Sequence, residues 1–467
     1  MSKRALFAIA LMLFSMFFGA GNLIFPPMLG ANAGDNFVPA VTGFLISGVA
    51  LPVLAIIAIA LSGQDIRALA ARAGTVFTIV FSIAIYLSIG TFFGIPRTGA
   101  VSFSTAVSPV TGWESTPASV GFNLVFFAVA TWLALNPSGL VDRLGKVLTP
   151  ALLTLLAVLI VLSLFQLHNP GAAPTEEYAA SPFPAGLMEG YFTMDSLAAL
   201  AFGILVISAI KEQKIANPLP GTTMAALGAG ALLGTIYLGL AIMGSRIPEG
   251  QSYKDGATLL SHASLQVLGF PGQVLGGVVL LACLTTAVGL LAATSEFFNY
   301  LVPKISYRTW LMTFAVVSFG IASGGLETVI SIATPIIVFI YPVAMTVIIV
   351  TLIGAVVKPI LPLYWGFAIP AWGVFLWSVV DKIVTWQSGA PINLPLFNAD
   401  FTWLAPALAG LAIGASIDFF RKEDCQRRIA ALGYRKRRYV PYKRCLRRHG
   451  QWYLSFCMTG VSHRHAT

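Results

Sequence analysis

A charge-free apolar stretch from Ala5 to Leu29 is long enough to cross a bilayer, and it carries Gly-Ala-Gly-Asn-Leu-Ile-Phe-Pro-Pro at positions 19–27. Glycine loosens a helical backbone, and proline removes a donor and clashes with the preceding turn. In hydrocarbon every freed N–H or C=O group needs another partner, so irregular backbone at this depth must line a cavity or bind a ligand. The stretch therefore predicts a discontinuous membrane helix with a binding site at the break. The alternative is a proline kink, with glycines that serve only close helix packing.

Composition assigns the whole chain to the membrane. Its 467 residues are 57% hydrophobic and 10% charged, with a mean hydropathy of +0.84. A water-soluble protein of this size needs a charged exterior, so we predict an all-α integral membrane protein. The net charge of +10 suggests nucleic acid at first sight, but 13 of the 28 basic residues lie in 421–467. Residues 1–420 carry 15 basic and 16 acidic side chains, which predicts no nucleic-acid partner.

Twelve apolar segments have the length of a transmembrane helix. The basic residues of the loops between them fall mainly on one side, and such residues stay in the cytoplasm, so both termini are predicted to be cytoplasmic. The predicted spans lie near 5–29, 37–62, 76–104, 119–135, 147–165, 187–210, 221–245, 273–301, 307–322, 327–352, 362–385 and 402–420.

The sixth span repeats the irregularity of the first, because Glu-Gly-Tyr-Phe-Thr-Met-Asp-Ser-Leu at 189–197 again places polar residues in a membrane segment. An offset of five spans reverses the direction of crossing, as an inverted-topology repeat requires. We expect repeat one at about 5–165, repeat two at about 187–352 and a terminal helix pair at about 362–420. At about 1.5 Å per residue, both irregular segments lie near the middle of a core about 30 Å thick and can face each other.

Asp195 is the strongest single candidate for a functional residue. An ionisable side chain inside a span is costly and marks a functional site by default. It could pair with a ligand ammonium, take part in ion binding or carry a proton, and Thr193 could offer a hydroxyl and a carbonyl to the same site. The alternative is that Asp195 caps the second half of the broken helix. For Arg97, the other buried charge, pairing with a carboxylate or a helix C-terminus is favoured over ligand contact.

These motifs, with Gly-Ile-Pro-Arg-Thr-Gly at 94–99, resemble the branched-chain amino acid:cation symporter family, a bacterial group within the amino acid–polyamine–organocation superfamily. The resemblance covers residues 1–420 and implies the LeuT-type fold, a five-plus-five inverted repeat with helices one and six broken, followed by two terminal helices. It implies a multi-pass protein of the cytoplasmic (inner) membrane that imports leucine, isoleucine and valine with sodium or protons by alternating access. Neither an enzymatic activity nor an organic cofactor is expected, and the oligomeric state stays open. The alternative is a cation-coupled carrier of another small amino acid or organic solute with the same fold.

The resemblance also implies a substrate site at the two breaks. The backbone N–H groups of Ala20 and Gly21 would face the substrate carboxylate, and Asn22 would lie near a sodium ion or the substrate. Thr193 and Asp195 would complete this site from the sixth span.

A sodium site is implied between spans one and eight. Its ligands would be the carbonyls of Ser15 and Phe18, the carbonyl of Ala282, and the hydroxyls of Thr285 and Thr286. Hard cations take oxygen ligands, and neutral oxygens suffice for a monovalent ion. The alternative is that the two threonine hydroxyls bond to carbonyls of their own helix, as hydroxyls in membrane spans commonly do.

A basic segment, residues 421–467, follows the last span and is predicted to be disordered. From Arg435 to Arg448 it carries eight positive charges in fourteen residues. Such a cluster is attracted to anionic lipid by about 1 kcal/mol per basic residue near the surface. We expect contact with membrane lipid without a role in transport. Accidental coding by frameshift or read-through is the second interpretation, and nucleic-acid binding the third.

Overall fold

The computed structural model describes residues 3–62, 66–135, 140–168, 172–212, 218–358, 361–390, 392, 394 and 401–431, and within them helices coincide with all twelve predicted spans. Nine helical stretches of this part are long and apolar enough to cross a membrane by themselves. The first and sixth spans are each divided into two shorter helices, and the ninth is a helix of 17 residues. The predicted all-α membrane fold is therefore confirmed.

The helices that form the spans follow the chain in a simple order. The first span is α1 and α2, the second α3 and α4, the third α6 and α7, the sixth α12 and α13, and the last two are α19 and α20. Their bounds are α1 (Lys3–Phe17), α2 (Ala20–Ala33), α3 (Phe37–Leu45), α4 (Leu51–Ser62), α6 (Thr75–Leu87), α7 (Gly94–Ser102), α9 (Thr116–Leu135), α10 (Leu140–Gln166), α12 (Pro182–Phe192), α13 (Asp195–Glu212), α14 (Pro218–Ser245), α16 (Phe270–Leu301), α17 (Tyr307–Ser323), α18 (Gly325–Val357), α19 (Trp365–Ser388) and α20 (Leu404–Ala431). A further helix, α15 (Gly256–Leu268), lies between the seventh and eighth spans.

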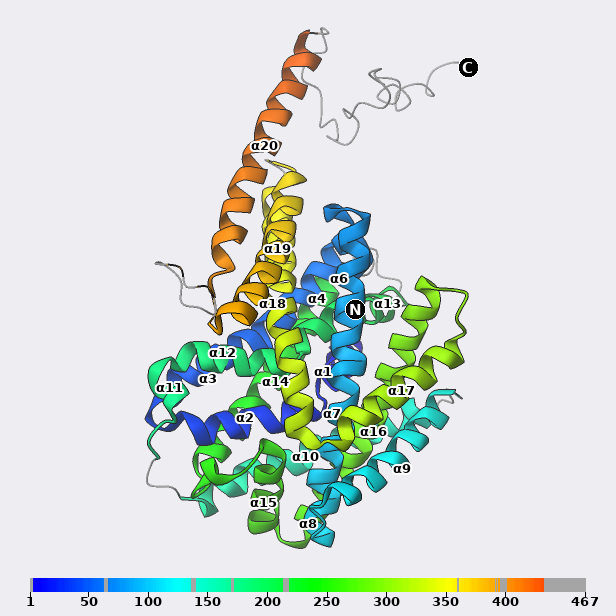
Figure 1. Ribbon diagram of the computed structural model, residues 1–467, viewed down its shortest axis with the longest axis vertical. Coiled ribbons are helices and arrows are strands. Elements are labelled where there is room, and N and C mark those ends of the chain that lie inside the picture. Colours follow the sequence, from blue (N-terminus) through cyan, green and yellow to red (C-terminus); the bar gives the residue numbers. More distant parts are fainter. Residues whose placement is uncertain are drawn as a thin grey trace. The chain divides into compact units, whose positions relative to one another are not determined.

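The first broken span packs along the seventh span, and the sixth, which is also broken, packs along the second. Helix α2 lies along α14, and α12 lies along α3 (Figure 1). Glycines permit these close crossings, because a side chain on Gly30 would overlap the carbonyl of Ala241, and one on Gly186 would overlap the carbonyl of Ala40. This exchange of partners is what two inverted repeats produce, and it brings the two breaks together.

The first span is interrupted only at residues 18–19, between α1 and α2. Pro26 and Pro27 lie inside α2, contrary to the expectation that they help to interrupt the helix. Each proline lacks the N–H that would bond to the carbonyl four residues earlier, so the carbonyls of Asn22 and Leu23 lose their usual helical partners. The prolines therefore free backbone acceptors close to the break without forming it.

The chain divides into two compact units, residues 1–71 with 75–348, and residues 72–74 with 349–467. In the second unit, one carboxylate oxygen of Asp418 on α20 accepts hydrogen bonds from the backbone N–H groups of Tyr364, at 2.6 Å, and Gly366, at 2.9 Å. This carboxylate caps the N-terminus of α19, where anions are favoured.

The boundary of the C-terminal tail needs a correction. Helix α20 continues to Ala431, so residues 421–431, which we predicted to be disordered, are helical. The last predicted apolar span ends near residue 420, but Arg421, Lys422 and Glu423 are good helix formers, so the helix can continue beyond it. The remainder of the predicted tail, with its basic cluster, lies outside the described residues.

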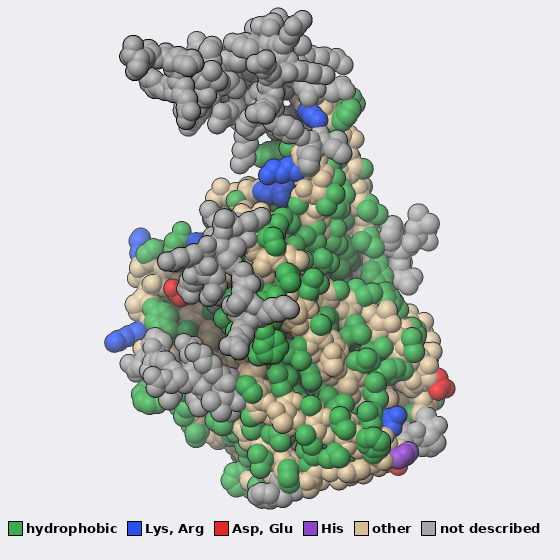
Figure 2. Space-filling model, turned by 180° about the vertical axis from the view of Figure 1, so that it is seen from behind, with side chains coloured by type: hydrophobic (Ala, Val, Ile, Leu, Met, Phe, Trp, Pro, Cys, Tyr) green, Lys and Arg blue, Asp and Glu red, His purple; other side chains and the backbone are tan. Residues whose placement is uncertain are grey.

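Hydrophobic side chains cover much of the molecular face in Figure 2, and the charged side chains visible there are few. On the fourth and fifth spans, Trp132 is 63% exposed and Phe165 is 74% exposed. Contact of apolar area with water costs about 25 cal/mol per Å². A surface of this kind suits hydrocarbon, and it supports the assignment of these helices to the membrane.

Candidate functional site

The two helix breaks face each other, as the sequence predicts. Span six is interrupted at residues 193–194, and Met194 there has a left-handed backbone conformation with φ 67°. Such a conformation costs about 1–3 kcal/mol for a residue with a side chain, so the surrounding contacts must hold it. From the other break, the side-chain amide of Asn22 donates to both carboxylate oxygens of Asp195, at 2.9 Å each.

Tyr237 on α14 completes this polar cluster. Its hydroxyl donates to Oδ2 of Asp195 at 2.5 Å and accepts from the amide of Asn22. The three side chains are at most 2% exposed. The Oδ1 atom of Asn22 also accepts from the backbone N–H of Gly19 at 3.0 Å. The carboxylate of Asp195 is thus an acceptor that links spans one, six and seven, and it ties the geometry of one break to the other.

Arg97 reaches the second break from span three. Its guanidinium donates to the carbonyl of Phe192 at 2.7 Å and to that of Thr193 at 3.2 Å. These carbonyls end α12, where the last groups lack helical partners and carry partial negative charge. The pairing agrees with the expectation that Arg97 binds a helix C-terminus. It also brings a buried positive charge beside the cluster of Asp195, with which the guanidinium interacts electrostatically.

An irregular turn within span three positions Arg97. Span three contains a π-helical turn over Ser88–Phe92, in which Gly90 has the non-helical angles φ −90° and ψ −111°. The chain becomes α-helical again at Gly94, and Arg97 lies in this first turn. The ring of Phe93 lies 4.4 Å from the guanidinium carbon and supports it through a cation–π contact.

The residues predicted to bind the substrate come together at a small cavity between the breaks. Its volume is about 50 Å³, and Ala20, Asn22, Thr193, Asp195 and Arg97 are among the residues that line it. The fifth predicted residue, Gly21, lies next to Arg97, because a side-chain carbon added to it would overlap the guanidinium. A volume of this size holds about four water molecules at most. A small organic ligand would therefore require the breaks to move apart.

The predicted sodium ligands are less closely assembled. The hydroxyls of Thr285 and Thr286 donate to the carbonyl of Ala282 at 2.8 Å and 3.0 Å, which is the alternative that the sequence left open. Thr286 nevertheless lines the cavity at the first break, so span eight does lie beside span one there.

On span one, the hydroxyl of Ser15 bonds to that of Thr149 on α10 at 2.9 Å. Phe18 stacks on Phe14 with ring centroids 4.9 Å apart, and its N–H bonds to the carbonyl of Phe14. These contacts fix the end of α1 next to the break, and they use the two side chains and the backbone N–H of Phe18 rather than the two carbonyls named from the sequence.

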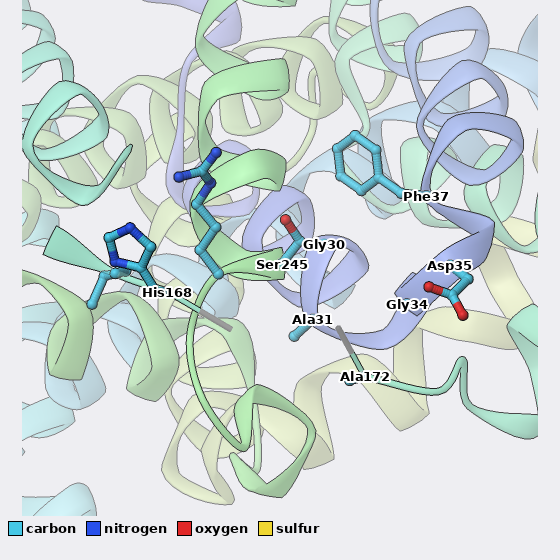
Figure 3. A pocket seen from close by; sticks show the side chains of 10 residues that line it. Gly30, Ala31, Gly34, Asp35, Phe37, His168, Ala172 and Ser245 are labelled. Carbon is cyan, nitrogen blue, oxygen red and sulfur yellow. The ribbon is translucent and has the colours of Figure 1, made fainter. Parts of the chain in front are cut away.

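A larger cavity of about 390 Å³ lies at the far end of α2 (Figure 3). Asp35, His168 and Arg246 line it, and each lies at or beyond the end of a membrane span. Arg246 donates to the carbonyl of Leu164 at 2.7 Å and so binds the end of α10. Because this cavity is remote from both breaks, we place the functional site at the smaller one.

Tyr237 is the site residue that sequence reasoning missed. It is a single tyrosine in an apolar span, and its partner Asp195 lies 42 positions earlier in the chain. One signal was available, because a tyrosine hydroxyl in the membrane interior needs a hydrogen-bond partner. That signal does not say which residue the partner is.

Comparison with known sequences gives a consistent result. The family described as branched-chain amino acid transport protein matches residues 2–421. The branched-chain amino acid permease BrnQ of Corynebacterium glutamicum is 48% identical over 430 residues, which are 90% of this chain and 97% of the relative. The branched-chain amino acid permease BraB of Bacillus subtilis is 38% identical over 429 residues, covering 88% of this chain and 95% of the relative.

Two solved structures share the arrangement of helices. An inward-facing conformation of Mhp1 matches with a TM-score of 0.56 and 15% identity, over 90% of this chain and 91% of the other. MhsT in complex with L-phenylalanine matches with a TM-score of 0.55 and 18% identity, over 87% of this chain and 98% of the other. At this level of identity the likeness concerns the fold alone, which is the LeuT type.

Proposed function

The chain belongs to the branched-chain amino acid transport protein family, and from this premise we propose that it imports leucine, isoleucine and valine by cation-coupled symport. Members of this family are transporters, not enzymes. The observation that carries the proposal is the meeting of two helix breaks at Asn22 and Asp195 in the protein interior. Discontinuous helices of this kind supply free backbone groups for a charged substrate at the membrane midplane.

In this proposal the zwitterionic part of the substrate lies between the breaks. The backbone N–H groups of Ala20 and Gly21 open α2 at its positive end, where a carboxylate is favoured. The carboxylate of Asp195 attracts the ammonium group, and Asn22 and Thr193 fix the orientation. The cavity of about 50 Å³ widens to admit the substrate, and alternating access follows from movement of the helices that carry the breaks.

Gradient-driven uptake tests this function. The purified protein would be reconstituted in liposomes, and uptake of labelled leucine measured under an inward sodium gradient and, separately, an inward proton gradient. We expect saturable uptake that one gradient accelerates and that unlabelled isoleucine and valine inhibit. Absence of uptake of all three amino acids under both gradients would contradict the proposal.

For the coupling ion we propose sodium, with protons as the alternative. The carbonyl of Ala282 and the hydroxyls of Thr285 and Thr286 would turn toward the ion together with the carbonyls of Ser15 and Phe18. In support, Thr286 lines the cavity at the break of span one. Rotation about χ1 is enough to exchange a bond within the helix for a bond to an ion.

Substitution of the two threonines tests the ion site. Thr285→Ala and Thr286→Ala each remove one oxygen ligand, so each should raise the sodium concentration for half-maximal leucine uptake by about 5-fold or more. Ser295→Ala is a matched control on the same helix, because its buried hydroxyl also bonds within α16, to Leu291 at 2.6 Å. The control should leave the sodium dependence unchanged. If the wild type and both threonine variants need the same sodium concentration for half-maximal leucine uptake, these hydroxyls are not ligands of the coupling ion.

We also propose that the protein lies in the bacterial cytoplasmic membrane with both termini in the cytoplasm, as the basic loop residues indicate. A reporter enzyme that is active only in the cytoplasm, fused after Ala431, should be active. A periplasm-specific reporter at the same position should be inactive, and the reverse pattern would contradict this orientation.

A further inference from the structure

One N–H group of the buried guanidinium of Arg97 has no partner. Arg97 is 6% exposed, and within the described part of the chain its Nε atom is a buried donor without a hydrogen-bond acceptor. An unmade hydrogen bond of a buried charged group costs free energy. Such a group therefore points to an acceptor that joins the site when it functions.

The rest of the guanidinium is held in a fixed plane. One terminal nitrogen donates to the carbonyl of Phe192 and the other to that of Thr193. The ring of Phe93 supports one side of the group. These contacts orient the planar donor group in advance, so little side-chain entropy remains to be lost when an acceptor binds.

The guanidinium also lies against the first turn of α2. A side chain added to Gly21 would overlap three atoms of the group, so only glycine leaves room for it here. The first N–H groups of a helix have no partner within the helix. Two independent sets of donors, the opening N–H groups of α2 and the free N–H of Arg97, therefore converge beside one cavity, which both Arg97 and Asp195 line.

We propose that Arg97 binds the carboxylate of the transported amino acid, while Asp195 attracts its ammonium group. This assignment rests on the proposed function and adds the residue that recognises the acid end of the substrate. A guanidinium presents parallel N–H groups that match the two oxygens of a carboxylate. The opposite charges of Arg97 and Asp195 at one cavity complement a zwitterion, and they disfavour substrates that lack either charge.

The test compares leucine with leucinamide, which keeps the ammonium group and the side chain but has a neutral amide in place of the carboxylate. Inhibition of labelled leucine uptake by each compound gives a ratio of half-inhibitory concentrations for the wild type, Arg97→Gln and Arg97→Lys. We expect the preference for leucine to fall about 10-fold or more in Arg97→Gln, because a charge-assisted hydrogen bond to the carboxylate is lost. Arg97→Lys keeps the positive charge but lacks the parallel N–H groups of a guanidinium. Its preference for leucine should therefore lie between those of the wild type and Arg97→Gln.

A purely structural role of Arg97 would lower the rate of leucine uptake without changing the ratio of the two half-inhibitory concentrations. Arg246→Gln is the matched control, since Arg246 also donates to a carbonyl at the end of a helix but lies at the remote cavity. Its ratio should equal that of the wild type. An unchanged ratio in Arg97→Gln would overturn the assignment, and if that variant does not fold, an unchanged ratio in Arg97→Lys would do so. Failure of the wild type to transport leucine would instead overturn the proposed function itself.

Discussion

Asp195→Asn is expected to lower the rate of leucine uptake by about 100-fold or more, while the protein still inserts into the membrane. The substitution removes the negative charge beside Arg97 and replaces one acceptor oxygen by a donor that faces Tyr237 and Asn22. A hydrogen bond to a charged group is worth about 1.5–3 kcal/mol, and the carboxylate of Asp195 accepts such bonds from Asn22 and Tyr237. A tenfold effect corresponds to about 1.4 kcal/mol, so the expected loss is large. Uptake per molecule of inserted protein is the quantity to measure.

Two further variants separate charge from geometry at this position. Tyr237→Phe keeps the charge of Asp195 and removes one of its hydrogen bonds, so it should retain more activity than Asp195→Asn. Asp255→Asn is the matched control, because Asp255 also begins a helix and its carboxylate accepts from the N–H of Thr258 at 2.8 Å. The control should transport like the wild type. Normal uptake by Asp195→Asn would assign Asp195 to structure alone.

Gly21→Ala is expected to lower uptake by at least about 10-fold. The added carbon would lie within 3 Å of three guanidinium atoms of Arg97, whose position two carbonyls and an aromatic ring hold. The guanidinium must move, which disturbs both the end of α12 and the donors at the cavity. A buried polar contact of this kind is worth about 1.5–3 kcal/mol.

Helix propensity predicts the opposite direction for Gly21→Ala, because alanine in a helix is favoured over glycine by about 1 kcal/mol. Gly289→Ala on α16 controls for this effect, since nothing lies within 4 Å of a side-chain carbon added at that position. It should keep normal uptake and an unchanged or slightly raised melting temperature. Loss of activity in Gly289→Ala as well, or normal activity in Gly21→Ala, would contradict the close contact with Arg97.

The two helix breaks and their meeting were predictable from the sequence. Glycine, asparagine and proline inside a span, and an acidic residue five spans later, have few explanations other than discontinuous helices. The exact position of the first break was less accessible, since Pro26 and Pro27 suggest an interruption that occurs seven residues earlier, at residues 18–19. Local propensity marks the region of a break, while the start of α2 is held by hydrogen bonds of Asn22 to Gly19, Asp195 and Tyr237.

Contacts between distant spans were not predictable in the same way. Tyr237 meets Asn22 because α14 packs along the first broken span, and no periodic pattern in either segment encodes that pair or the bond from Tyr237 to Asp195. Arg97 was recognisable as a buried charge with a helix C-terminus as partner, but not as a neighbour of Gly21. The threonines of α16 show the same limit, because one sequence is compatible with hydroxyls that face an ion and with hydroxyls that face their own helix.

The central claim is that this chain carries branched-chain amino acids through a site between its two helix breaks, and counterflow tests it most directly. Liposomes that contain the purified protein and unlabelled leucine would be diluted into a trace of labelled leucine, with equal cation concentrations on both sides. Label should accumulate transiently inside, equally when isoleucine or valine replaces the internal leucine, and Asp195→Asn should show no such accumulation. Absence of accumulation by the wild-type protein with each of the three amino acids would contradict the claim.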